Sequence, residues 1–188
     1  MAVDEYNQRR NSEQAEANAL GTEYVRIDLL PAADANNVRE LMREYLRQRI
    51  LFYSSHDTRQ LRDVNSGAAR LQKNLWSAVR TVGTTRTDPV FSLIVSGMND
   101  VFSSQTYAQA LSENRIPVEA WLLMGAIAIC ANLLLGYTAE CIQRKAKRFF
   151  VLPLLVSIAF FLVADLDNPR QGVISINPRD LIILSRSM

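Results

Sequence analysis

Two aspartates and an arginine follow the most apolar part of the sequence. The stretch FLVADLDNPRQG places Asp165, Asp167 and Arg170 directly after a run of large apolar residues. Carboxylates in this position suit a cation site at a membrane mouth, which would need further oxygen ligands. The simpler interpretation is structural, in which Asp167, the adjoining Asn-Pro and Gly172 stop the helix and Arg170 or Arg179 pairs with the acids. A partner-docking motif is the third alternative.

A single strongly polar residue lies in the middle of the preceding apolar segment. Asn132 falls within Val118–Tyr137, where an amide most often forms a hydrogen bond to a neighbouring helix. Lining an ion path is the alternative role for this side chain. With Asp165, Asp167 and Arg170, Asn132 completes our set of candidate residues for an ion path or a membrane-mouth site.

The remaining reactive residues give little support for catalysis. His56 is the only histidine, so one chain cannot supply a multi-histidine metal site. Cys130 and Cys141 lie about 16 Å apart along one helix, too far for a mutual disulfide, and we expect both to be buried. No phosphate-binding loop, dinucleotide fingerprint or paired CxxC occurs. We expect no enzymatic activity, no cofactor, no metal and no nucleic-acid partner.

Two apolar segments must position these candidates. Residues 118–137 would span about 30 Å as a helix, long enough to cross a bilayer, and residues 149–164 would span about 24 Å. We predict a transmembrane hairpin over residues 117–166. A soluble hairpin buried in a core is the alternative, because the second segment is short for a bilayer.

The connection between the two segments is strongly basic. By the positive-inside rule, this loop is cytoplasmic, and the helical region before it and the tail at 167–188 lie outside the cytoplasm. The same cations suit anionic lipid headgroups. They are Arg144, Lys145, Lys147 and Arg148.

The chain before the hairpin predicts four helices. The first three cover about residues 2–30, 34–53 and 57–86, the fourth starts at residue 88, and turn signals separate them. The third carries the clearest seam of apolar residues, and the fourth begins with Asp88 as a capping residue before Pro89. We predict an all-α protein with an antiparallel helical bundle over residues 1–116, followed by the hairpin.

The second predicted helix contains a run of charges. We interpret it as a solvent-exposed face with local ion pairs. Its cations are Arg39, Arg43, Arg47 and Arg49, with Glu40 and Glu44 between them.

Four segments of the sequence resemble the bacterial bestrophin-like membrane proteins. They are EANALGTEYVRIDLLP at 16–31, VRELMREYLRQRI at 38–50, ENRIPVEAW at 113–121 and DLDNPRQGVISINPRDL at 165–181. The resemblance implies a multi-pass protein of the bacterial plasma (inner) membrane, with two further membrane helices upstream of this sequence. It also implies kinship with bestrophins, which are oligomeric anion channels.

Two functions remain open at this stage. The first is an ion-conducting or ion-gating homo-oligomer, with the lipid bilayer and ions as its partners. The second is a membrane-anchored helical sensor or scaffold without transport activity.

Overall fold

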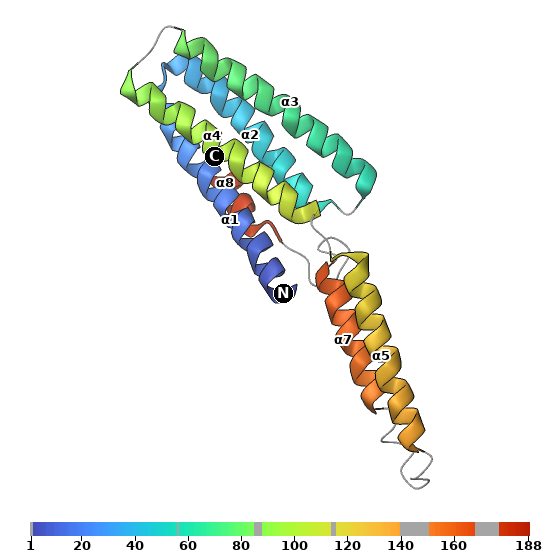
Figure 1. The fold of residues 1–188 in the computed structure, drawn as a ribbon. Coiled ribbons are helices and arrows are strands. Elements are labelled where there is room, and N and C mark those ends of the chain that lie inside the picture. The colour runs from blue at the N-terminus through green and yellow to red at the C-terminus, as the bar shows by residue number, and fades with distance from the viewer. Residues whose placement is uncertain (1, 56, 85–87, 114–115, 140–150, 168–176) are drawn as a thin grey trace.

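The predicted all-α fold class is confirmed. The computed structural model of the protein describes residues 2–55, 57–84, 88–113, 116–139, 151–167 and 177–188, and every regular element in these ranges is a helix. The long bundle helices are α1 (Ala2–Arg26), α2 (Ala32–Ser54), α3 (Thr58–Gly83) and α4 (Pro89–Glu113), with a 3-10 turn, η1 (Ile27–Leu29), after α1. An antiparallel pair, α5 (Val118–Ala139) and α7 (Val151–Asp167), extends from the bundle, and α8 (Arg179–Ser187) returns to it (Figure 1).

The helix boundaries follow local capping chemistry. The Asp57 carboxylate accepts a hydrogen bond from the Arg59 amide, and Asp88 Oδ1 accepts one from the Phe91 amide at 2.8 Å. Both residues therefore cap helices, as was predicted for Asp88. The second helix begins earlier than predicted, because Pro31, rather than Asp34, occupies the N-cap position of α2.

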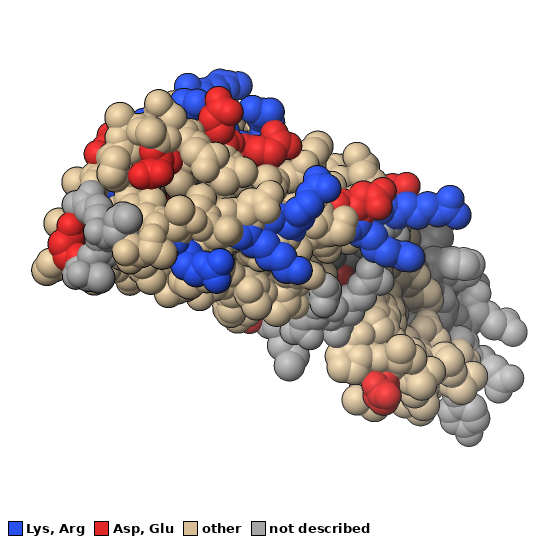
Figure 2. Space-filling view, turned by 90° about the horizontal axis from the view of Figure 1, so that it is seen from above, with Lys and Arg blue, Asp and Glu red and all other residues tan. Residues whose placement is uncertain are grey.

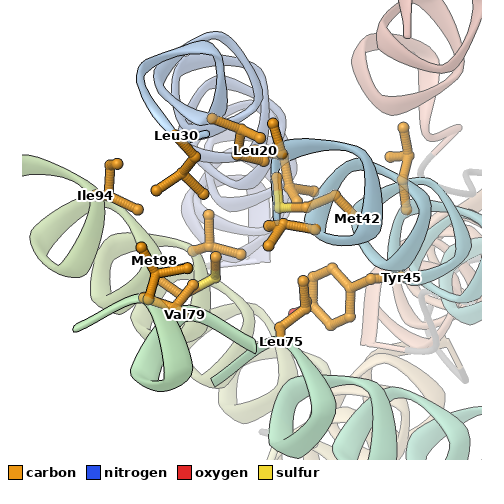
Figure 3. Close-up of a cluster of buried hydrophobic side chains, with 14 of the residues drawn as sticks. Leu20, Leu30, Met42, Tyr45, Leu75, Val79, Ile94 and Met98 are labelled. Carbon is orange, nitrogen blue, oxygen red and sulfur yellow. The ribbon is translucent and has the colours of Figure 1, made fainter. Parts of the chain in front are cut away.

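The bundle is held by one apolar core. α1 packs mainly against α4 and α2 against α3, so each long helix turns one face inward. Figure 3 shows side chains from all four helices meeting in this core. The predicted seam of α3 is confirmed as buried at Val64, Ala68, Leu75, Val79 and Val82.

The short C-terminal helix packs against one side of the bundle. α8 packs against α1 and α2, and its Leu181 is completely buried in the core. The end of the chain therefore lies beside the middle of the bundle, although the hairpin precedes it in sequence (Figure 1).

The surface of the hairpin differs from that of the bundle. Thirteen large apolar side chains of α5 and α7 are exposed, at Val118, Leu122, Leu123, Ile127, Ile129, Leu133, Leu134, Val151, Leu154, Leu155, Ile158, Phe161 and Leu162. Cys130 is exposed as well, so the prediction that this thiol is buried is wrong. Within the ranges described above, no helix combines the length and the apolar character needed to cross a membrane.

Candidate functional site

The aspartate at the end of α7 binds the backbone just before α5. Asp167 Oδ1 accepts a hydrogen bond from the Ile116 amide at 2.8 Å, two residues before the first residue of α5. Unsatisfied N–H groups and the positive end of the dipole make this end of a helix favourable for a carboxylate. Asp165 is buried on the same helix, which packs against α1. This geometry supports the structural interpretation of Asp167.

The amide in the middle of α5 is occupied within its own helix. Asn132 Nδ2 donates to the Ala128 carbonyl oxygen at 2.7 Å, and the side chain is half-buried. A cavity of about 300 Å³ lies between α5 and α7, and the lining includes Met124, Ala131 and Phe160 but not Asn132. Arg170 and the basic cluster Arg144, Lys145, Lys147 and Arg148 lie outside the described residues.

The most unusual chemistry lies in the bundle, where α1 turns charged side chains toward the core. Arg9, Glu13, Glu16 and Glu23 are all buried. Their spacing continues the apolar positions of Leu20 and Ile27 at intervals of three and four residues. The sequence analysis did not assign these residues a site, although charges at core spacing were visible in the sequence.

Glu16 and Arg49 form the centre of this buried network. Arg49 Nε donates to Glu16 Oε1, and Arg49 Nη2 donates to Glu16 Oε2 at 3.1 Å. Tyr53 OH also donates to Glu16 Oε2, at 3.0 Å, and the guanidinium lies 4.3 Å from the centre of the Phe52 ring. The prediction that Arg49 belongs to a solvent-exposed face is therefore wrong, because Glu16 gives it a buried partner on another helix.

The network keeps its phenol protonated. Burial raises the pKa of Tyr53, the nearby Glu16 carboxylate raises it further, and Arg49 opposes both effects. Tyr53 consequently remains a hydrogen-bond donor to Glu16 throughout the physiological range. For Arg49, burial acts to lower the pKa, but the charge and hydrogen bonds of Glu16 prevail and raise it. Arg49 is therefore a charged donor, and both of its hydrogen bonds go to the Glu16 carboxylate.

Two further contacts fasten α8 to the bundle. Glu13 Oε1 accepts a hydrogen bond from the Leu181 amide at 3.1 Å, in the first turn of α8. At the other end, Arg43 Nε and Tyr24 OH donate to the Met188 carbonyl oxygen at 2.8 and 3.0 Å. Arg43 therefore links α2 to the C-terminal end of α8. The prediction that it belongs to a solvent-exposed face is wrong.

Glu23 is buried without a full partner. Neither carboxylate oxygen has a hydrogen-bond partner among the described residues, and the nearest cation, Arg26 Nη1, lies 3.7 Å from Oε2. Burial raises the pKa of Glu23 to about 8, Arg26 lowers it in part, and Asp100 on α4 raises it. A Cβ atom on Gly97 would collide with this carboxylate, so the glycine provides its space. Glu23 is therefore a proton-binding group inside the bundle.

These groups offer ion pairs and proton binding rather than a recognisable metal centre. In the ranges that the structure describes, no three His, Cys, Asp or Glu side chains are grouped so that they could hold a metal ion. The buried charges join α1 to α2, to α8 and, through Arg9 and the Leu111 carbonyl oxygen, to α4. Asp167 joins the two ends of the hairpin.

The architecture defines a class of protein in which a helical bundle with a charged interior carries an apolar helical hairpin. The family model described as the Bestrophin-like domain matches residues 1–181, and the chain belongs to this family. The resemblance seen in the sequence is thereby confirmed. Comparisons with curated proteins and with solved structures find no match.

Proposed function

We propose that the protein is a membrane-anchored helical scaffold or sensor, whose hairpin inserts into a lipid bilayer and whose bundle lies outside it. The exposed apolar surface of α5 and α7 carries this proposal. Removing a large apolar side chain from water contributes about 1.5–3 kcal/mol. Thirteen partly exposed side chains therefore represent a penalty comparable with the entire stability of a domain, about 5–15 kcal/mol. A lipid environment removes this penalty.

The remaining parts of the proposal follow from charge and family. The basic loop at 144–148 favours a cytoplasmic connection, which assigns the bundle to the other side of a bacterial inner membrane. The interaction partners are the lipid bilayer and further copies of the chain, with no nucleic acid, and no catalytic activity is proposed.

An ion-conducting homo-oligomer is the second candidate function. It is favoured by membership of the Bestrophin-like family and by the buried Asp165 at the hairpin mouth. Two helices cannot enclose a pore, so conduction would require several copies around an axis. The scaffold is preferred because Asn132 and Asp167, two of the candidate ion-path residues, already have backbone partners.

The thiol on α5 tests insertion directly. In a Cys141→Ser background, Cys130 carries an environment-sensitive fluorophore, and the protein is reconstituted into phosphatidylcholine vesicles that contain brominated acyl chains. We expect a blue-shifted emission that the bromines quench. The matched control moves the thiol to exposed Ser77 on α3, where quenching should be absent. A water-like emission from both positions would refute insertion.

A flux assay on the same vesicles separates the two functions. Under the scaffold proposal, no ion flux is expected from wild-type protein with a correctly inserted hairpin. An ion flux from the wild-type protein, with a selectivity that changes in Asp165→Asn, would refute the scaffold proposal and support the ion-conducting function.

A further inference from the structure

The outward face of α3 carries a row of cations. The row has five members, which are named below. At about 100° per residue, their positions on α3 fall within roughly 80° of one another, and the row extends about 32 Å along the helix. Figure 2 shows Lys and Arg side chains following one another along the upper face of the bundle, where α3 lies in Figure 1. The exposed members of the row are Arg59, Arg62, Arg70, Lys73 and Arg80.

The charge of this row is largely unbalanced in the described part of the chain. None of the five cations forms an ion pair among the described residues. Asp63 is the only acidic residue of α3, so this helix has five basic residues and one acidic residue. Charges of one sign held along a rigid face produce a potential that attracts an anionic partner.

An apolar cavity lies at the C-terminal end of the row. It has a volume of about 310 Å³ between α3 and α4, and its lining includes Trp76, Gly83, Phe91, Val95 and the last cation of the row, Arg80. A Cβ atom on Gly83 would lie 2.8 Å from the Phe91 ring, so the glycine permits the close approach of the aromatic wall. Trp76 is 40% exposed and packs against Phe102 on α4 with ring centres 6.4 Å apart.

We propose that the cationic row and this cavity form one docking surface for an acidic polypeptide segment with a large apolar anchor side chain. The anchor enters the cavity between Trp76 and Phe91, and carboxylates of the segment pair with the row. A row of about 32 Å matches about ten residues of extended chain, which is more than a small anion could reach. Charge complementarity supplies attraction, and the cavity supplies specificity.

The placement of α3 favours a polypeptide over a lipid surface. α3 lies on the upper side of the bundle in Figure 1, whereas the hairpin extends downward from it. The inference rests on the proposed scaffold role, because it names the chemistry of the partner that the scaffold would hold. The two proposals fail separately, since peptide binding and insertion of the hairpin have different readouts.

The indole in the cavity reports on binding. Trp76 and Trp121 are the two tryptophans of the chain, so Trp121→Phe leaves Trp76 as the single tryptophan, which is excited selectively over tyrosine. The full chain is placed in phosphatidylcholine nanodiscs and titrated with a synthetic peptide of Asp and Glu that contains one central bromophenylalanine. We expect saturable quenching of Trp76 fluorescence that weakens as the salt concentration rises.

Matched variants separate the docking surface from general charge effects. Arg70→Gln/Lys73→Gln/Arg80→Gln should weaken peptide binding about tenfold, as expected for the loss of three exposed ion pairs. The control, Arg10→Gln/Arg47→Gln/Arg186→Gln, removes the same charge from exposed positions on other helices and should leave the affinity within about twofold.

Three results would overturn the proposal. The first is equal weakening by both triple variants, which would indicate a nonspecific effect of net charge. The second is equal affinity, measured by calorimetry, for a peptide with alanine in place of the anchor. The third is displacement of the peptide by phosphatidylglycerol vesicles in a way that depends on Arg70, Lys73 and Arg80. That result would identify the surface as a lipid-binding site. Circular dichroism confirms that each variant is folded.

Discussion

Glu16 on α1 and Arg49 on α2 form an ion pair in which neither side chain is exposed to solvent. Tyr53 completes the hydrogen bonds of the glutamate, and Phe52 covers the guanidinium. Buried pairs of this kind contribute little net stability relative to an apolar pair, but loss of one partner leaves an uncompensated charge. The pair therefore specifies how α1 and α2 align more than it strengthens the bundle.

Removal of one partner of this pair should destabilise the bundle strongly. We expect Arg49→Met to lower the free energy of unfolding by about 3–5 kcal/mol, because Glu16 would stay buried without its counter-ion. The double variant Glu16→Met/Arg49→Met should recover most of this loss. Thermal unfolding in detergent, followed by circular dichroism, measures both. Arg47→Met, at an exposed pair with Glu44, is the control and should change stability by less than about 1 kcal/mol.

Loss of the Asp167 carboxylate should open the mouth of the hairpin. Asp167→Ala removes the acceptor of the Ile116 amide and should cost about 1 kcal/mol, as loss of one hydrogen bond typically does. Hydrogen exchange at Ile116 should accelerate, whereas Asp167→Asn retains an acceptor and should protect the amide. Unchanged exchange in Asp167→Ala would show that this hydrogen bond contributes nothing in solution.

The stability of the bundle should fall as the pH rises because of Glu23. Its pKa rises from 4.5 to about 8 on folding, so the folded state holds a proton that the unfolded state releases between these values. This contribution is complete below pH 4.5 and is lost as the pH rises to about 8. Glu23→Gln should therefore be more stable than wild type at pH 8, with a flatter pH dependence.

Burial also raises the pKa of Glu13. Because Glu13 is present in both proteins, the difference between wild type and Glu23→Gln isolates the pH dependence that Glu23 contributes. Glu40→Gln, at an exposed position on α2, serves as the matched control and should follow the wild-type curve. Parallel pH curves for wild type and Glu23→Gln would contradict the assignment of the buried proton.

The clamp on the Met188 carbonyl should control the docking of α8. Arg43→Ala removes donors from α2, and Tyr24→Phe removes a hydroxyl from α1. Each lost hydrogen bond is expected to cost about 1 kcal/mol, so the double variant should show faster hydrogen exchange throughout α8. Arg186→Ala, which is exposed on α8 itself, is the control. Equal protection of α8 in the double variant and in wild type would indicate that Leu181 alone holds the helix.

The bundle was predictable because its helices carry local signals. Asp57 and Asp88 are capping residues followed by helical periodicity, and the α3 seam has apolar residues at regular intervals. The end of α1 was less predictable. η1 at Ile27–Leu29 continues the helical path in a tighter turn, and periodicity alone does not separate the two.

The buried charges were not predictable from the same rules. Arg43, Arg47 and Arg49 look alike in sequence, but only the packing of α1 and α8 decides which are covered. Asp167 was recognised as a helix stop, whereas its partner, Ile116, is 51 residues away in the chain. Such pairings depend on the arrangement of helices in space, which local patterns do not encode.

The bond between Asp167 and the Ile116 amide has a mechanical consequence. It joins the base of α7 to the base of α5, so the two helices cannot splay at this end without breaking it. α7 also packs against α1, and α8, which follows it in the chain, is tied to Glu13. A tilt of the hairpin relative to the bundle therefore acts as a torque on α1, the helix that carries the buried glutamates.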